Sequence, residues 1–115
     1  MEDKTVKWCG NSRKDIRSFP ERARLLAGFE LMLLQKGEQA TDFKPMKTVG
    51  RAVYELRIKD ESNQFRIFYI AKFTEAIYVL HAFQKTNQKT PNKDLDLAKS
   101  RYKDLISGRK AMKNK

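Results

Sequence analysis

Cysteine, histidine and glycine, on which many catalytic, metal and nucleotide sites depend, are scarce in this sequence. There is one cysteine, Cys9, so no disulfide can form within the chain, which suits a reducing cytoplasm. There is one histidine, His81, which excludes catalysis by a pair of histidines within one chain. No cysteine or histidine cluster has the spacing of a zinc site, and the five glycines form no Walker or dinucleotide-binding loop. We therefore expect neither a metal ion nor another cofactor.

Long apolar runs are also missing. The N-terminal residues 1–4 contain no apolar signal core, and no run approaches the roughly 18 apolar residues that would span a membrane. The sequence thus predicts a cytoplasmic protein with no membrane partner.

Acidic residues are scarce relative to basic ones. Lysine and arginine total 25 and aspartate and glutamate 14, which gives a formal net charge of +11. This charge favours a polyanionic partner, RNA or DNA first; the alternative is a merely soluble, lysine-rich surface. Hydrophobic residues make up 40% of the 115 residues, which is enough for one domain with one modest core.

The first part of the chain predicts a strand and two helical segments. We expect the strand over residues 5–9 and a helical turn over residues 12–17. Ser18 as N-cap and Glu21 as its capping-box partner predict the start of a longer helix, and Gly37 predicts its end. The apolar stripe of this helix, which we expect to pack in the core, comprises Leu25, Leu26, Phe29, Met32 and Leu33.

The second part predicts three strands and a last helix. After a connection over residues 40–50, the strands are expected at 52–58, 64–72 and 76–83, and the short turns between them favour an antiparallel meander. Thr90 as cap and Pro91 at the first position begin the last helix, and Gly108 ends it. Its apolar side comprises Leu95, Ala98, Tyr102, Leu105 and Ile106.

Together these elements predict a small α+β domain over residues 1–108. The meander and the N-terminal strand form a twisted antiparallel sheet, which the N-terminal helices and the C-terminal helix pack against. Residues 109–115 carry four basic residues and no acid, and we expect a disordered tail there.

Two arginines stand out because they lie inside apolar strand patterns. An unpaired arginine is costly in such a place, so Arg57 and Arg66 each need an acid or a phosphate beside them. The alternative to a phosphate is an ion pair within the chain, with Glu55, Asp60 or Glu61.

Further candidates follow in the last predicted strand and the polar segment after it. Alternation places His81 on one face with Ile77, Val79 and Phe83, where a structural role is the alternative to a functional one. Lys85 and Lys89 follow with no acid nearby, and either can be an ordinary solvated lysine. The earlier connection carries basic residues that face either a phosphate or solvent, namely Lys44, Lys47 and Arg51.

Such a basic set is able to cut RNA without a metal ion. The 2′-hydroxyl attacks the adjacent phosphate, which yields a 2′,3′-cyclic phosphate and a free 5′-hydroxyl. Arginine and lysine stabilise the charge that develops on the phosphate, and a lysine, tyrosine or histidine with a tuned pKa moves the protons.

Several segments, in this order and spacing, form a pattern similar to one known group of proteins. They are Val53–Arg57 (VYELR), Phe65–Tyr69 (FRIFY), Val79–Pro91 (VLHAFQKTNQKTP) and Ala98–Arg101 (AKSR). Over residues 6–106 the chain resembles the RelE/ParE superfamily of type II toxin–antitoxin toxins, in particular its HigB-like, phage-derived branch.

The resemblance implies a microbial RNase fold that cuts mRNA, commonly on the ribosome, without a metal ion. It also implies a cognate antitoxin, often a helix-turn-helix DNA-binding protein. Arg57 and Arg66 match basic strand positions of the family, which implies phosphate binding and transition-state stabilisation. His81 and Lys85 match a family element to which the resemblance assigns proton transfer and leaving-group stabilisation. Lys89 matches a position that guides RNA.

One position departs from the family pattern. This branch commonly has a second lysine directly after the first, where the chain has Thr86, so a mechanism with two lysines is in doubt. Two other functions stay open on the same fold. One is a ParE-like inhibitor of DNA gyrase, and the other is a non-catalytic module that binds nucleic acid or a partner protein.

Overall fold

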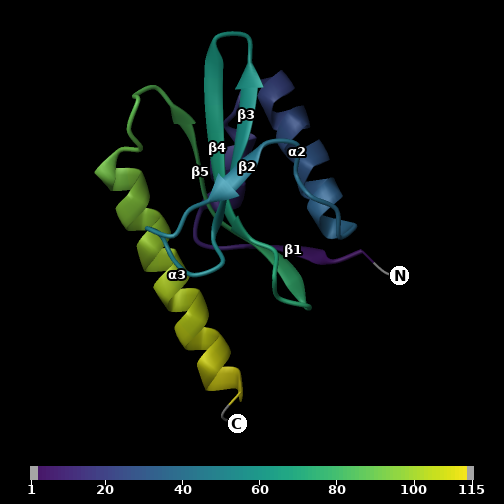
Figure 1. Ribbon diagram of the computed structural model, residues 1–115, viewed down its shortest axis with the longest axis vertical. Helices are drawn as coiled ribbons and strands as arrows, with labels where there is room; N and C mark the ends of the chain where they lie inside the picture. Colours follow the sequence, from purple (N-terminus) through teal and green to yellow (C-terminus); the bar gives the residue numbers. More distant parts are fainter. Residues whose placement is uncertain (1–2, 114–115) are drawn as a thin grey trace.

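The alternating apolar residues in the middle of the chain build the centre of a five-stranded sheet. The structure, a computed structural model, describes residues 3–113 (Figure 1). Along the chain the elements are β1 (Thr5–Trp8), α1 (Ser12–Arg17), α2 (Glu21–Gln35), β2 (Phe43–Pro45), β3 (Tyr54–Asp60), β4 (Asn63–Ile70), β5 (Ala76–Lys85) and α3 (Asn92–Lys113).

The strands lie in the order β1-β5-β4-β3-β2. The predicted meander is confirmed, since β3, β4 and β5 pair antiparallel in sequence. The predicted N-terminal strand is also present, but it pairs parallel with β5 and so makes the sheet mixed. The predicted connection over residues 40–50 contains a further short strand, β2, which pairs with β3 at the sheet edge. An edge strand tolerates Pro45 because one side of its backbone needs no partner.

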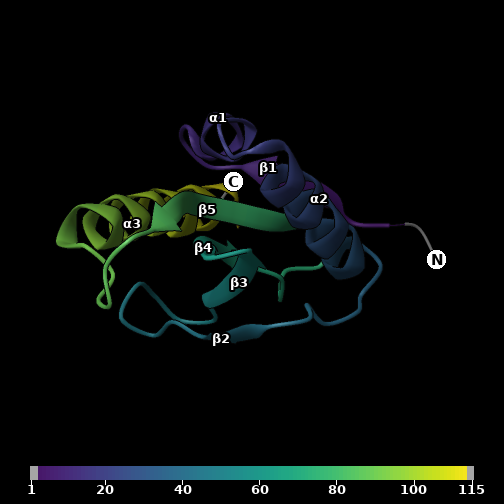
Figure 2. The same ribbon diagram turned by 90° about the horizontal axis from the view of Figure 1, so that it is seen from above.

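The sheet separates two layers of core. Leu56, Ile67 and Val79 pack with α1 and α2 on one face, and Phe68, Ile70 and Leu80 pack with α3 on the other. Seen from above, α2 and α3 lie on opposite sides of the sheet (Figure 2). The helix α3 packs on β5 rather than over the whole of its face, so on this face the parts of β3 and β4 nearest their hairpin are not covered by a helix.

The helix α2 turns a different face to the core from the one its hydrophobic stripe predicts. Leu25, Phe29 and Met32 are exposed, at 65%, 50% and 39%. The buried face lies roughly half a turn away from these three residues and comprises Ala23, Ala27, Glu30, Leu31 and Leu34. Small alanines let the helix axis approach the sheet closely. The buried Glu30 carboxylate accepts hydrogen bonds from the backbone N–H and the hydroxyl of Thr41, which satisfies its charge.

The capping box predicted at Ser18 and Glu21 is also wrong. Ser18 ends α1, where its Oγ donates to the carbonyl of Asp15 at 2.7 Å, and α2 begins after Pro20 with no side-chain cap. The connection between α1 and α2 is so short that one serine closes the first helix and is not free to start the second. The predicted stop at Gly37 is confirmed: its φ is 83°, and its N–H donates to Leu34.

A bulge in β5 changes which face its second half presents. Ile70 pairs with Tyr78 and Tyr69 with Val79, but Phe68 pairs with His81, so Leu80 is an extra residue. Alternation restarts after the bulge. His81 therefore lies on the α3 face, and not on the face of Ile77 and Val79 that simple alternation predicts.

The helix α3 is longer than the sequence predicts. It does not end at Gly108 but continues to Lys113, so the predicted disordered tail is helical over its described part, and residues 114 and 115 lie outside the described residues. Arg109 explains the extension, because its guanidinium lies 3.5 Å from the centre of the Phe73 ring and pairs with Glu75. These contacts offset the roughly 1 kcal/mol that a glycine costs within a helix. Within residues 3–113, none of the helices is long and apolar enough to cross a membrane.

Candidate functional site

Strand register brings the predicted basic residues onto one face of the sheet. Arg57 lies directly opposite Arg66, and Arg66 lies directly opposite Phe83. Two residues further along β5 and β4, Lys85 pairs with Gln64. Side chains two residues apart on a strand share a face, so all of these lie on the α3 side of the sheet. The site thus occupies the uncovered part of that face, toward the β3–β4 hairpin at the top of Figure 1.

A buried carboxylate lies at the centre of this face. Glu55 is 1% exposed, and its Oε1 accepts a hydrogen bond from Arg57 Nε at 3.2 Å. Arg66 Nε lies 3.5 Å and Lys44 Nζ 3.9 Å from the same oxygen. One negative charge therefore meets three positive charges from three neighbouring strands. We call Lys44, Glu55, Arg57 and Arg66 the basic cluster; it carries a surplus of two positive charges.

Arg66 is the most fixed member of the basic cluster. Its side chain is 7% exposed, its Nη1 donates to the carbonyl of Phe65 at 3.2 Å and its Nη2 donates to Gln64 Oε1 at 2.7 Å. A guanidinium has five N–H groups, so one on each terminal nitrogen remains for a further acceptor. Burial lowers the pKa of Arg66, Glu55 raises it, and Arg57 lowers it again. An arginine stays protonated under such a shift, so the group presents a permanent charge.

Lys85 lies at the end of β5 beside this charge. Burial lowers the pKa of Lys85, and the nearby charges of Arg66, Lys44 and Arg57 lower it further, while Glu55 opposes them. Lowering this pKa makes a lysine a better proton donor near neutral pH. Two hollows flank Arg66 and Lys85. One, of about 160 Å³, is lined by Asp42, Arg57 and Arg66 among others, and the second, of about 400 Å³, includes Gln64, Lys85 and Thr86.

The other predicted basic residues are not all in the basic cluster. Only Lys44 belongs to it. Lys47 and Arg51 lie in the exposed segment between β2 and β3, where the carbonyl of Arg51 accepts a hydrogen bond from the Tyr102 hydroxyl of α3 at 3.2 Å. Lys89 is exposed in the segment between β5 and α3. The structure therefore brings Arg57, Arg66, Lys85 and Lys44 together and leaves Lys47, Arg51 and Lys89 outside this group.

His81 is buried and fully engaged. It is 5% exposed, its Nε2 lies 2.7 Å from Asp94 Oδ1, and its Nδ1 lies 3.1 Å from Arg101 Nη1. Arginine only donates, so Nδ1 accepts and the ring carries its proton on Nε2, directed at Asp94. Arg101 also donates to the carbonyl of Leu80 at 3.0 Å, and Asp15 Oδ2 lies 3.7 Å from both Arg101 Nη1 and His81 Nδ1. The histidine thus ties α3 to β5, and Arg101 connects this contact to Asp15 of α1.

The chain packs closely around Arg101 as well. Gly10 has a φ of 54°, and a Cβ added there would lie 2.4 Å from Arg101 Nε. This position therefore needs glycine both for its backbone conformation and for the approach of the guanidinium.

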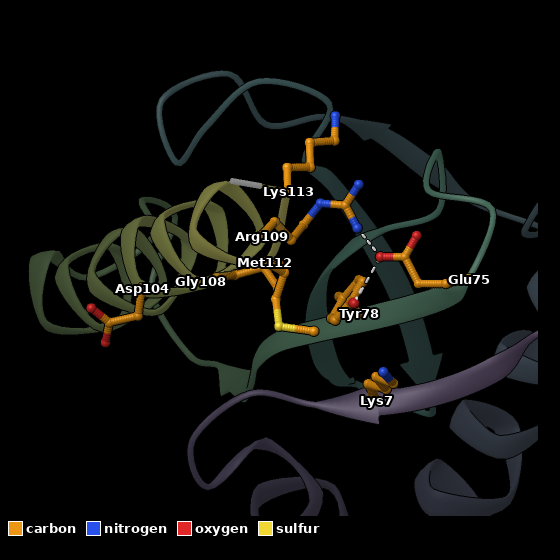
Figure 3. Close-up of a pocket in the computed structure, with 9 residues that line it drawn as sticks. Lys7, Glu75, Tyr78, Asp104, Gly108, Arg109, Met112 and Lys113 are labelled. Atoms are coloured by element: carbon orange, nitrogen blue, oxygen red, sulfur yellow. Dashed lines mark hydrogen bonds and ion pairs between the residues drawn. The ribbon is translucent and has the colours of Figure 1, made fainter. Parts of the chain in front are cut away.

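A larger hollow lies elsewhere. It measures about 660 Å³ and lies at the opposite end of β5, between Lys7 of β1 and the last turns of α3 (Figure 3). Glu75 there accepts hydrogen bonds or ion pairs from the Tyr78 hydroxyl and from Arg109. Glu75 is thus paired within this hollow, whereas the basic cluster carries surplus positive charge.

Sequence reasoning missed two features of the site. Glu55 was considered only as one of three alternative ion-pair partners, whereas it contacts three of the basic residues. Glu55 lies two residues before Arg57 and therefore on the same strand face, and this spacing was the available signal. Asp94 and Arg101, which hold His81, lie 13 and 20 residues after it, and no local pattern connects them.

The comparisons with known proteins bear on the same residues. Residues 14–103 match the family model described as "Phage derived protein Gp49-like". The chain belongs to this family. It is a phage-derived family of type II toxin–antitoxin toxins related to RelE and ParE, and a cognate antitoxin is its implied partner. No curated protein matches the chain. The matched part of this Gp49-like chain extends from α1 into α3 and contains the whole basic cluster, Lys85 and His81.

Proposed function

We propose that this toxin is a metal-independent mRNA endoribonuclease of the HigB-like branch, acting on the ribosome in the cytoplasm. The observation that carries the proposal is the convergence of Arg57, Arg66, Lys44 and Lys85 on one open sheet face. A surface with surplus fixed positive charge and two free N–H groups on one arginine suits a phosphodiester.

In the proposed reaction, the 2′-oxygen of one nucleotide attacks the adjacent phosphorus and the bond to the 5′-oxygen breaks. Arg66 and Arg57 bind the phosphate oxygens and stabilise their growing negative charge. Lys85, whose pKa is lowered, donates a proton to the leaving 5′-oxygen. The products are a 2′,3′-cyclic phosphate and a 5′-hydroxyl.

The proton of the 2′-hydroxyl needs an acceptor, and His81 is the proposed candidate. Its Nδ1 lone pair is directed at Arg101 in this structure. The imidazole becomes available to RNA only when Arg101 turns away, so its catalytic role requires a movement of α3. The exposed Lys47, Arg51 and Lys89 are proposed to guide RNA toward the basic cluster through phosphate contacts.

The proposed partner in the cell is an antitoxin of the helix-turn-helix class. A chain with a net charge of +11 attracts an acidic segment, and such a segment on the basic face would exclude RNA.

The test is to incubate the purified protein with translating ribosomes and mRNA in the presence of a chelator. We expect cleavage, with products that carry 2′,3′-cyclic phosphate and 5′-hydroxyl ends, and no cleavage where the 2′-hydroxyl at the cut position is replaced by hydrogen. Arg66→Ala is expected to abolish cleavage and growth arrest with an unchanged circular dichroism spectrum. Growth arrest with intact mRNA and inhibited DNA supercoiling would reject the ribonuclease in favour of gyrase inhibition.

A further inference from the structure

The carboxylate beneath the basic cluster contacts cations from three different strands. Lys44 comes from β2, Arg57 from β3 and Arg66 from β4, and all three approach Glu55 Oε1 within 3.9 Å. Arg57 and Arg66 are also directly opposite each other in the β3–β4 register. Like charges directly opposite on neighbouring strands are destabilising, so the two guanidiniums need this carboxylate to remain side by side.

We infer that Glu55 is a positioning residue, which holds the guanidiniums of Arg57 and Arg66 in the orientation that binds and stabilises the reacting phosphate. The inference rests on the proposed function and deepens it, because it assigns a role to a residue that does not touch the substrate. Arg66 is fixed at two of its N–H groups, which donate to Phe65 and Gln64, and its Nε lies 3.5 Å from Glu55 Oε1 as an ion pair without a hydrogen bond. The two free N–H groups, one on Nη1 and one on Nη2, are thereby held in a fixed direction.

A direct proton-transfer role for Glu55 does not fit the geometry. Its side chain is 1% exposed, and the oxygen Oε1 is covered by three cations, which leaves no approach for a 2′-hydroxyl. The side chains above it are more accessible, at 33% for Arg57 and 49% for Lys44. A phosphate therefore meets the cations, and the carboxylate acts through them.

The distinguishing experiment compares Glu55→Gln with Glu61→Gln. Both changes remove one negative charge, but Glu61 is exposed in the β3–β4 turn and has no contact with the basic cluster. Positioning predicts that Glu55→Gln lowers kcat by about 100-fold, the size of effect that a small misplacement of a catalytic group produces. The KM should stay equal or fall, since the face becomes more positive. Glu61→Gln should leave kcat unchanged.

The pH profile separates positioning from proton transfer. If Glu55 positions the arginines, the residual activity of Glu55→Gln keeps both limbs of the wild-type profile. Loss of the acidic limb would identify Glu55 as the base and overturn the inference, as would full kcat in the variant. Glu55→Asp serves if Glu55→Gln does not fold, since it keeps the charge but withdraws it by one methylene; wild-type kcat in that variant would also overturn the inference.

Two readouts need no catalytic activity, and so separate this inference from the proposed function. Removing the Glu55 charge should lower the pKa of Lys85, because Glu55 raises it against the effects of burial, Arg66, Lys44 and Arg57. The Nε–H signals of Arg57 and Arg66 should move and exchange faster in an NMR spectrum of Glu55→Gln. If wild type cleaves no RNA but both changes occur, the ribonuclease proposal fails and the positioning contact stands. If neither occurs, the positioning role is rejected.

Discussion

Arg57 and Arg66 face each other across β3 and β4, and both form ion pairs with one oxygen of the buried Glu55 carboxylate, to which Arg57 Nε also donates a hydrogen bond. Two guanidiniums held this way offer planar, paired donors instead of two independent point charges. The geometry makes specific demands on the residue type at each position.

The first prediction concerns the shape of the Arg66 side chain. Arg66→Lys keeps the charge but loses the bonds to Phe65 and Gln64 together and the two free N–H groups. We expect RNA affinity to change little and the cleavage rate to fall about 100-fold or more, as for a lost transition-state donor. Single-turnover cleavage with saturating protein measures the rate, and a lysine variant as fast as wild type would show that charge alone suffices.

A second prediction separates contacts that bind phosphate from those that do not. Lys44→Ala removes a half-exposed cation of the basic cluster, whereas Lys110→Ala removes an exposed cation at the far end of α3. On single-stranded RNA, each lost phosphate contact should reduce the slope of log K against log salt by about 0.7. We expect this reduction for Lys44→Ala, and an unchanged slope for Lys110→Ala. Equal slopes for the two variants would place the RNA elsewhere.

The third prediction is an alkaline loss of stability caused by Tyr69. Burial raises the pKa of Tyr69 to about 12, with smaller contributions from Tyr54 and Glu30. Between pH 10 and 12 the unfolded chain has lost this proton and the folded chain retains it. Stability therefore falls as pH rises through this window, by up to about 2–3 kcal/mol from this group. Denaturant unfolding should show a shallower decline for Tyr69→Phe, and parallel curves would contradict the assignment.

A fourth prediction tests the orientation of α2. Phe29→Ser changes a half-exposed side chain and should alter the free energy of unfolding by less than about 1 kcal/mol. Ala27→Leu inserts bulk at a fully buried position against the sheet and should cost about 1–3 kcal/mol. A helix packed by its largest apolar residues would give the opposite order. Chemical denaturation of the two variants decides between these arrangements.

The sequence predicted the meander and the α+β class because period-two patterns and short turns are local signals. It misjudged α2 because a stripe of Leu, Phe and Met carries a stronger hydrophobic signal than alanines that pack closely. The extent of α3 depended on Arg109 reaching Phe73 and Glu75, which lie more than thirty positions earlier in the chain. No local pattern contains such a contact.

The candidate site shows the same limit of local sequence patterns. Arg57 and Arg66 were identifiable as charges inside apolar strands, and register then places them together. The burial of His81 between Asp94 and Arg101 depends on how α3 packs, and on a bulge that no residue type announces. A catalytic role for His81 stays a prediction, and its engaged nitrogens make it conditional on movement of α3.

The extra residue in β5 has a consequence for how this strand tolerates change. Before Leu80, Ile77 and Val79 face the α2 core. After Leu80 the alternation of the two faces is shifted by one residue, which puts His81, Phe83 and Lys85 on the α3 face. A regular β5 of the same sequence, without the bulge, would turn Lys85 toward the α2 core and place Ala82 opposite Arg66. The bulge absorbs Leu80 as the extra residue, so deletion of Leu80 alone would leave His81, Phe83 and Lys85 on the α3 face. The position of the bulge therefore decides that this strand presents charge beside Arg66.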